Sequence, residues 1–125
     1  MLELRFPWLW MGVGWLLVAG VCLGSLLPIH GVDTGLSDKW LHFASYFALT
    51  VWFCGLYATI GHYAVITAIV IAFGAVLDVL QGATVARTFD LLDVLANALG
   101  ALAGFVLVCL VLGGWCAKLE RWIVR

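Results

Sequence analysis

The amino-acid sequence predicts an all-α membrane protein, with a bundle of four transmembrane helices followed by a short amphipathic helix at the membrane surface. Two observations predict this fold class. Of the 125 residues, 66% are hydrophobic and 10% are charged, a composition too apolar for an ordinary soluble domain. The chain also contains four apolar stretches, each close to the roughly 20 residues that a helix needs to cross a bilayer. Its length suits one unit, so we expect residues 1–125 to form a single membrane domain.

The predicted transmembrane helices occupy about 8–27, 39–58, 63–80 and 91–112, with turns between them. The first stretch is longer than the apolar core of a typical signal peptide, so we expect it to be retained as a helix. The last segment, 114–125, gathers apolar side chains on one face and basic side chains on the other, which is typical of a helix lying on a membrane surface. A frayed tail is the alternative for that segment.

Charged residues predict the topology. With both termini in the cytoplasm, four of the six Lys and Arg residues are cytoplasmic, and the other two, Lys39 and Arg87, lie outside. This distribution satisfies the positive-inside rule, so we expect the first and third loops to face outward. The net charge of −1 and the lack of a basic run argue against nucleic-acid binding.

Polar residues cluster at the ends of three predicted helices. They are Asp38, His42 and Tyr46 in the second helix, Asp78 and Gln81 in the third, and Asp90, Asp93 and Asn97 in the fourth. Within each helix the spacing places them on or beside one face, and the topology places all three ends at the outer side of the membrane. Ionisable residues inside membrane-spanning helices usually face a bundle interior or a water-filled cavity. The sequence therefore predicts a shared polar pocket in the outer half of the bilayer, with these residues as binding candidates.

The charge balance of this pocket leaves its chemistry open. Lys39 and Arg87 are the expected positive partners of the four aspartates, with Arg87 paired to Asp78. The excess of negative charge would raise some carboxylate pKa values, favour a protonated His42 or recruit a cation. No Cys and His residues stand at metal-ligand spacing, so the sequence identifies no metal site and no cofactor.

Several of these residues also have a structural interpretation. Asp38 and Asp90 resemble capping or first-turn acids, which a helix dipole stabilises without any ligand. For His42 the alternative is a buried residue held by hydrogen bonds. The small-xxx-small pattern predicts helix-packing surfaces at two glycine pairs, namely Gly20 with Gly24 and Gly100 with Gly104.

Three motifs follow one another in the order found in a known family. They are Asp38-Lys39-x-x-His42-Phe43-x-x-Tyr46, then an acidic residue and Gln81, then Arg87-x-x-Asp90-x-x-Asp93-x-x-x-Asn97-x-x-Gly100. Over residues 37–104 the chain resembles the VanZ-like family of small bacterial integral membrane proteins. Asp78 is a departure, because the family more often carries Glu there. The resemblance implies a bacterial cytoplasmic-membrane location and an association with resistance to teicoplanin, a lipophilic glycopeptide, and leaves the biochemical activity open.

We expect the pocket to bind an amphiphile, either a teicoplanin-type glycopeptide or a lipid-linked cell-wall precursor, in glycopeptide resistance or envelope maintenance. Lys39 and Arg87 suit a phosphate or carboxylate head group, and membrane lipids are further expected partners. One alternative is a membrane enzyme acting on a lipid-linked head group. In that case His42 is the general acid or base, and Asp93 orients it or holds a cation. The other alternative is a structural bundle or homo-oligomer fixed by a polar network.

Overall fold

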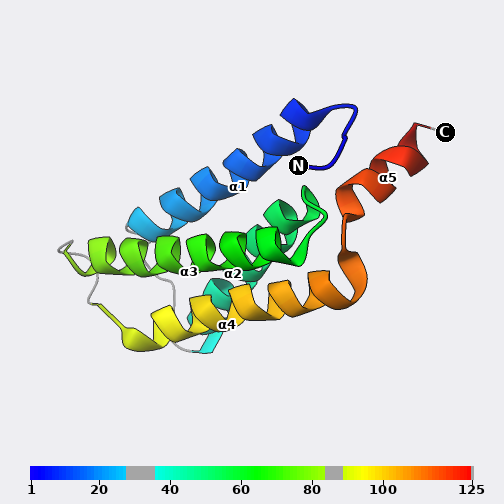
Figure 1. The fold of residues 1–125 in the computed structure, drawn as a ribbon. Coiled ribbons are helices and arrows are strands. Elements are labelled where there is room, and N and C mark those ends of the chain that lie inside the picture. The colour runs from blue at the N-terminus through cyan, green and yellow to red at the C-terminus, as the bar shows by residue number, and fades with distance from the viewer. Residues whose placement is uncertain (28–35, 84–88, 125) are drawn as a thin grey trace.

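The computed structural model describes residues 1–27, 36–83 and 89–124, and within these ranges all regular secondary structure is helical. The elements are α1 (Pro7–Leu26), α2 (Leu36–Gly55), α3 (Ile60–Gly82), α4 (Leu91–Leu107), the π-helical turn η1 (Val108–Leu112) and α5 (Trp115–Ile123). Figure 1 shows α1 to α4 as long helices packed beside one another, with the short α5 set apart from them. The all-α prediction and the short C-terminal helix are confirmed.

Three of the described helical segments are long and apolar enough to cross a membrane. They are α1, α3 and the continuous segment Leu91–Leu112, formed by α4 and η1, with mean hydropathies of 1.9, 2.3 and 2.4. The prediction of four such segments is therefore wrong for α2, although α2 has 20 residues. Asp38, Lys39 and His42 fall in its first two turns, and these polar side chains lower its hydropathy. The helices thus indicate a membrane protein with three apolar spans.

α2 is central to the packing, because α1, α3 and α4 all contact it. Its most extensive contact is with α4, where two glycines let the backbones approach closely. A Cβ atom added at Gly100 would overlap the carbonyl group of Phe43, and one at Gly104 would lie 3.0 Å from the carbonyl oxygen of Phe47. The packing role predicted for Gly100 and Gly104 is confirmed.

α1 is the peripheral helix of the bundle. Gly14 is its single buried residue, and it lies against Trp52 and Phe53 of α2. By contrast, a Cβ atom added at Gly20 or Gly24 would find no neighbouring atom within 4 Å. The packing role predicted for Gly20 and Gly24 is therefore wrong, because in the described part of the chain no neighbouring helix approaches either glycine closely.

The start of α1 is held by Glu120 from α5. Oε2 of Glu120 accepts a hydrogen bond from the backbone N–H of Arg5 at 2.6 Å. Oε1 accepts one from the backbone N–H of Phe6 at 2.9 Å and one from the indole N–H of Trp10 at 3.1 Å. Phe6 is the N-cap residue of α1, so Glu120 bonds amide groups that the helix itself leaves without acceptors. Burial raises the pKa of Glu120, but these hydrogen bonds outweigh burial and hold it below its usual value.

Glu120→Gln is expected to lower the thermal unfolding temperature of the purified protein at neutral pH by a few degrees. Glutamine replaces one carboxylate oxygen by an NH₂ donor, so at least one of these hydrogen bonds is lost. Because the folded pKa is lowered, the stabilisation is present above the pKa of the unfolded chain and is lost as pH falls through the folded value. The difference from wild type should therefore vanish in acid.

Glu3→Gln is the matched control, since Glu3 is exposed. Differential scanning of the two variants across pH measures the effect. Equal melting temperatures at neutral pH would show that Glu120 does not stabilise the start of α1.

Candidate functional site

A buried chain of side chains links α3, α4 and α2. Asn97 Nδ2–H donates to Asp78 Oδ2 at 2.7 Å, and Asn97 Oδ1 lies 2.9 Å from His42 Nδ1. An amide oxygen only accepts hydrogen bonds, so His42 Nδ1 carries the proton in this pair. In the neutral imidazole, Nε2 is then unprotonated and has a free lone pair. Because Asn97 and Asp78 are 1% and 3% exposed, they fix both the orientation and the tautomer of His42.

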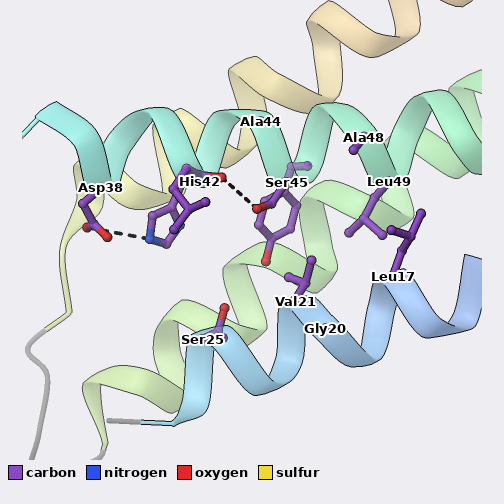
Figure 2. A pocket seen from close by; sticks show the side chains of 13 residues that line it. Leu17, Gly20, Val21, Ser25, Asp38, His42, Ala44, Ser45, Ala48 and Leu49 are labelled. Atoms are coloured by element: carbon purple, nitrogen blue, oxygen red, sulfur yellow. Dashed lines mark hydrogen bonds and ion pairs between the residues drawn. The ribbon is translucent and has the colours of Figure 1, made fainter. Parts of the chain in front are cut away.

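The other ring nitrogen of His42, Nε2, faces two carboxylates. Nε2 lies 3.9 Å from Asp38 Oδ2, one turn earlier in α2, and 3.8 Å from Asp93 Oδ2 in α4. Both distances are longer than N–H···O hydrogen bonds. Figure 2 shows Asp38 beside the ring of His42. The ligand atoms of Asp38, His42 and Asp93 all lie within 4.8 Å of one another, so these three residues can hold a metal ion.

Lys39 joins α2 to the N-terminal end of α4. Its Nζ donates to Asp90 Oδ2 at 2.6 Å and also to Asp93 Oδ1. Asp90 is the N-cap residue of α4, and its Oδ1 accepts from the N–H of Leu92 at 2.9 Å. The hydrogen bonds from Lys39 and Leu92 hold the pKa of Asp90 below its usual value. Asp90 therefore caps α4, and two aspartates neutralise Lys39.

The remaining candidates lie in different settings. Tyr46 is almost fully buried in α2. Gln81 Nε2–H donates to the carbonyl oxygen of Ser25, and this bond joins α3 to the end of α1. Arg87 lies outside the described residues, so its predicted pairing with Asp78 stays a prediction.

A cavity of about 440 Å³ lies between α1 and α2. α1 contributes Leu17, Gly20, Val21, Gly24 and Ser25, and α2 contributes Asp38, Leu41, His42, Ala44, Ser45, Tyr46, Ala48 and Leu49. Most of these residues are apolar, and the glycines leave space that larger side chains would fill. Figure 2 shows Asp38 and His42 at one end of the cavity and Leu49 toward the other. The cavity therefore has an apolar body and an ionisable end.

Sequence reasoning missed two features of this site. One is the contribution of α1, since its glycine pair was interpreted as a packing surface. The other is the set of ligand atoms that Asp38, His42 and Asp93 bring within 4.8 Å of one another, since the predicted pocket contained these residues without distinguishing them as a set. The i,i+4 spacing of Asp38 and His42 was the available signal, but the third residue is too distant in the chain to show a ligand spacing.

The structure brings together most of the predicted site residues from three helices, namely Asp38, Lys39, His42, Asp78, Asp90, Asp93 and Asn97. Comparisons with protein-family models, curated proteins and solved structures found no match. The resemblance to the VanZ-like family therefore stays a prediction, and the geometry of the cavity carries the functional argument.

Proposed function

We propose that this chain is a polytopic membrane protein that binds an amphiphile in the cavity between α1 and α2. One observation carries the proposal: an apolar cavity of about 440 Å³ ends at two buried ionisable residues, Asp38 and His42. Ligand sites are typically cavities of about 300–1,000 Å³, mostly apolar, with a few polar groups that fix orientation. An amphiphile matches this division, because its tail fits the apolar body and its head group reaches the ionisable end.

The lining of the cavity supports one orientation of the ligand in this proposal. The tail lies against apolar residues such as Val21 of α1 and Leu49 of α2, and the head group lies at Asp38 and His42. Asp38 forms no hydrogen bond with any residue in the described ranges, so its carboxylate is available to hydroxyl or amine donors of a sugar or peptide. Lys39, which the sequence suggested for a phosphate or carboxylate, is already held by two aspartates. We therefore assign head-group recognition to Asp38 and His42.

We further propose that α2 crosses the membrane as a fourth helix inside the bundle. Its 20 residues suffice for a span, and Asp38, His42 and Thr50 are buried, which shields them from lipid. With both termini in the cytoplasm, as the Lys and Arg distribution favours, the ionisable end lies in the outer half of the bilayer. On the VanZ-like resemblance we propose a bacterial cytoplasmic membrane and a contribution to glycopeptide resistance or envelope maintenance.

Titration of the purified protein in micelles tests the binding proposal. We expect saturable binding of teicoplanin or of a polyprenyl lipid that carries a sugar–peptide head group. Removing the acyl chain of the glycopeptide, or shortening the prenyl chain, should weaken binding by about tenfold or more, because each buried CH₂ group contributes about 0.8 kcal/mol. Binding that fails to saturate for both amphiphiles, or that is unchanged without the tail, would contradict the proposal.

The fixed tautomer of His42 favours one second function, an enzyme acting on a lipid-linked head group. His42 lines the cavity, and its Nε2 lies 3.8 Å from Asp93 Oδ2. An imidazole nitrogen can accept a proton from water or from a head-group hydroxyl. Mass spectrometry of candidate lipids after incubation with the protein, with and without Mg²⁺ or Mn²⁺, decides between the functions. Lipids recovered chemically unchanged would exclude the enzyme.

A further inference from the structure

We propose that Asp38, His42 and Asp93 bind one divalent cation of the first transition row, with zinc as the best-matched ion. Each residue offers one ligand atom, and these atoms lie within 4.8 Å of one another. All three residues are buried. Cation binding goes beyond the binding of an amphiphile, and its evidence does not depend on that function.

The distances around His42 Nε2 distinguish a shared ion from a hydrogen bond. Nε2 lies 3.9 Å from Asp38 Oδ2 and 3.8 Å from Asp93 Oδ2. A proton on Nε2 would bridge neither carboxylate, since N–H···O hydrogen bonds are about 2.7–3.2 Å long. Two ligand atoms that each lie about 2.1 Å from one ion can be up to about 4.2 Å apart. The separations of Nε2 from the two carboxylate oxygens lie within this limit, and all three ligand atoms lie within 4.8 Å of one another.

Neighbouring side chains hold two of the three ligand residues in the orientations that a metal ion requires. A ligating imidazole needs a free lone pair, and its other nitrogen usually donates to an acceptor that fixes the ring. His42 Nδ1 has this acceptor in Asn97 Oδ1 at 2.9 Å, and Asn97 is itself held by Asp78 at 2.7 Å. Asp93 accepts from Lys39 through Oδ1 and turns Oδ2 toward His42. Hydrogen bonds from neighbouring side chains thus orient both His42 and Asp93.

Asp38 provides an independent argument, because this largely buried residue accepts no hydrogen bond from the described residues. Its residue is 6% exposed, and its carboxylate forms no hydrogen bond within the described part of the chain. An unpaired buried carboxylate is strongly disfavoured. Asp78, Asp90 and Asp93 add three further carboxylates, and among the described residues Lys39 is the cation that pairs with this group. A divalent cation would balance most of the negative charge that remains on these described residues.

The ligand types select the ion. Mg²⁺ and Ca²⁺ prefer oxygen ligands alone, whereas one imidazole with two carboxylates suits Zn²⁺ or Mn²⁺, and zinc is the tighter binder of the two. Three protein ligands leave a coordination position open. Because Asp38 and His42 also line the cavity, a phosphate head group could occupy that position, a point that rests on the proposed function.

Calorimetric titration of the chelator-treated full chain with ZnCl₂ alone tests the site. We expect saturable binding of one ion, weakened about tenfold or more in Asp38→Asn. Asparagine keeps the size of aspartate and breaks no hydrogen bond with the described residues, so this variant should fold. His42→Gln should show the same loss. His62→Gln is the control for surface binding, because His62 is exposed on α3 and should be dispensable.

Three outcomes would overturn the proposal. The first is that the wild-type protein binds neither Zn²⁺ nor Mn²⁺ saturably. The second is that the Asp38→Asn protein has the zinc affinity of the wild type. The third is that zinc binding is lost in His62→Gln but kept in Asp38→Asn. Since no amphiphile is present in this titration, its failure does not affect the amphiphile experiment. Tail-dependent amphiphile binding in EDTA, combined with no zinc binding, would leave the cavity function standing and remove the metal site.

Discussion

Asn97→Leu is expected to destabilise the folded bundle by about 3 kcal/mol or more. Leucine branches at Cγ as asparagine does, but it is larger and can bond neither Asp78 nor His42. If the two hydrogen bonds alone counted, the loss would be about 1 kcal/mol, since interhelical side-chain hydrogen bonds in membranes average about 0.6 kcal/mol each. We expect the larger value because the carboxylate of Asp78, whose residue is 3% exposed, would lose its hydrogen-bond donor in the interior.

Reversible unfolding in mixed micelles, followed by circular dichroism, measures this effect. Ser45→Ala is the control, because its hydroxyl bonds the carbonyl oxygen of Leu41 within α2, and we expect a change within about 0.5 kcal/mol. The double variant Asp78→Leu with Asn97→Leu should recover part of the loss, since it removes the unpaired charge. An Asn97→Leu protein as stable as Ser45→Ala would show that the chain of hydrogen bonds does not hold the helices together.

The same variant addresses the structural alternative for the polar network. If Asn97→Leu lowers stability while the folded protein keeps its amphiphile affinity, the network serves packing. If affinity falls in protein that is still folded, Asn97 also positions His42 for binding.

Gly100→Val is expected to disrupt the contact between α2 and α4, with a loss of about 3 kcal/mol or a failure to fold. The first added carbon would overlap the carbonyl group of Phe43. That group belongs to the backbone and cannot rotate away, so the two helices must separate. Overpacking costs about 1–3 kcal/mol where side chains can adjust, and more where they cannot.

Gly12→Val is the matched control, because a Cβ atom at Gly12 of α1 has no neighbour within 4 Å. The unfolding assay and the yield of monodisperse protein measure both variants. Equal stability of Gly100→Val and Gly12→Val would mean that α2 and α4 do not approach as closely as the structure has them.

Helical periodicity predicted which faces meet, but not which side chains pair. The spacing of Asp90, Asp93 and Asn97 placed them on one face of α4, and that face contacts α2 and α3. Pairing also depends on the rotation of one helix relative to the next, which periodicity does not encode. The hydrogen bond from Asn97 to Asp78 was therefore not predicted, and the pairing of Asp78 with Arg87 stays a prediction.

The sequence also did not predict the cavity or the contact between α5 and the start of α1. Gly20 and Gly24 have the same spacing as Gly100 and Gly104, yet the second pair alone meets a neighbouring backbone. A pair of small residues predicts a smooth surface but does not tell whether another helix packs on it.

The sequence assigned no role to Glu120. An acidic residue on the polar face of a terminal helix is usually exposed to solvent, and the partners of Glu120 lie at the other end of the chain.

Binding of an amphiphile in the cavity between α1 and α2 is tested most directly by a cavity-filling variant. Gly20 lines the cavity, and a Cβ atom there has no neighbour within 4 Å. Gly20→Phe should therefore fill the space without disturbing the packing. Gly12→Phe is the matched control, since Gly12 is equally open on α1 but does not line the cavity.

The measurement is the dissociation constant of the amphiphile that the wild-type protein binds, determined for both variants in the same micelles. We predict that Gly20→Phe weakens binding by about tenfold or more, equivalent to about 1.4 kcal/mol, while Gly12→Phe binds as the wild type does. Equal affinities of the two variants would contradict the claim and place the ligand elsewhere on the protein.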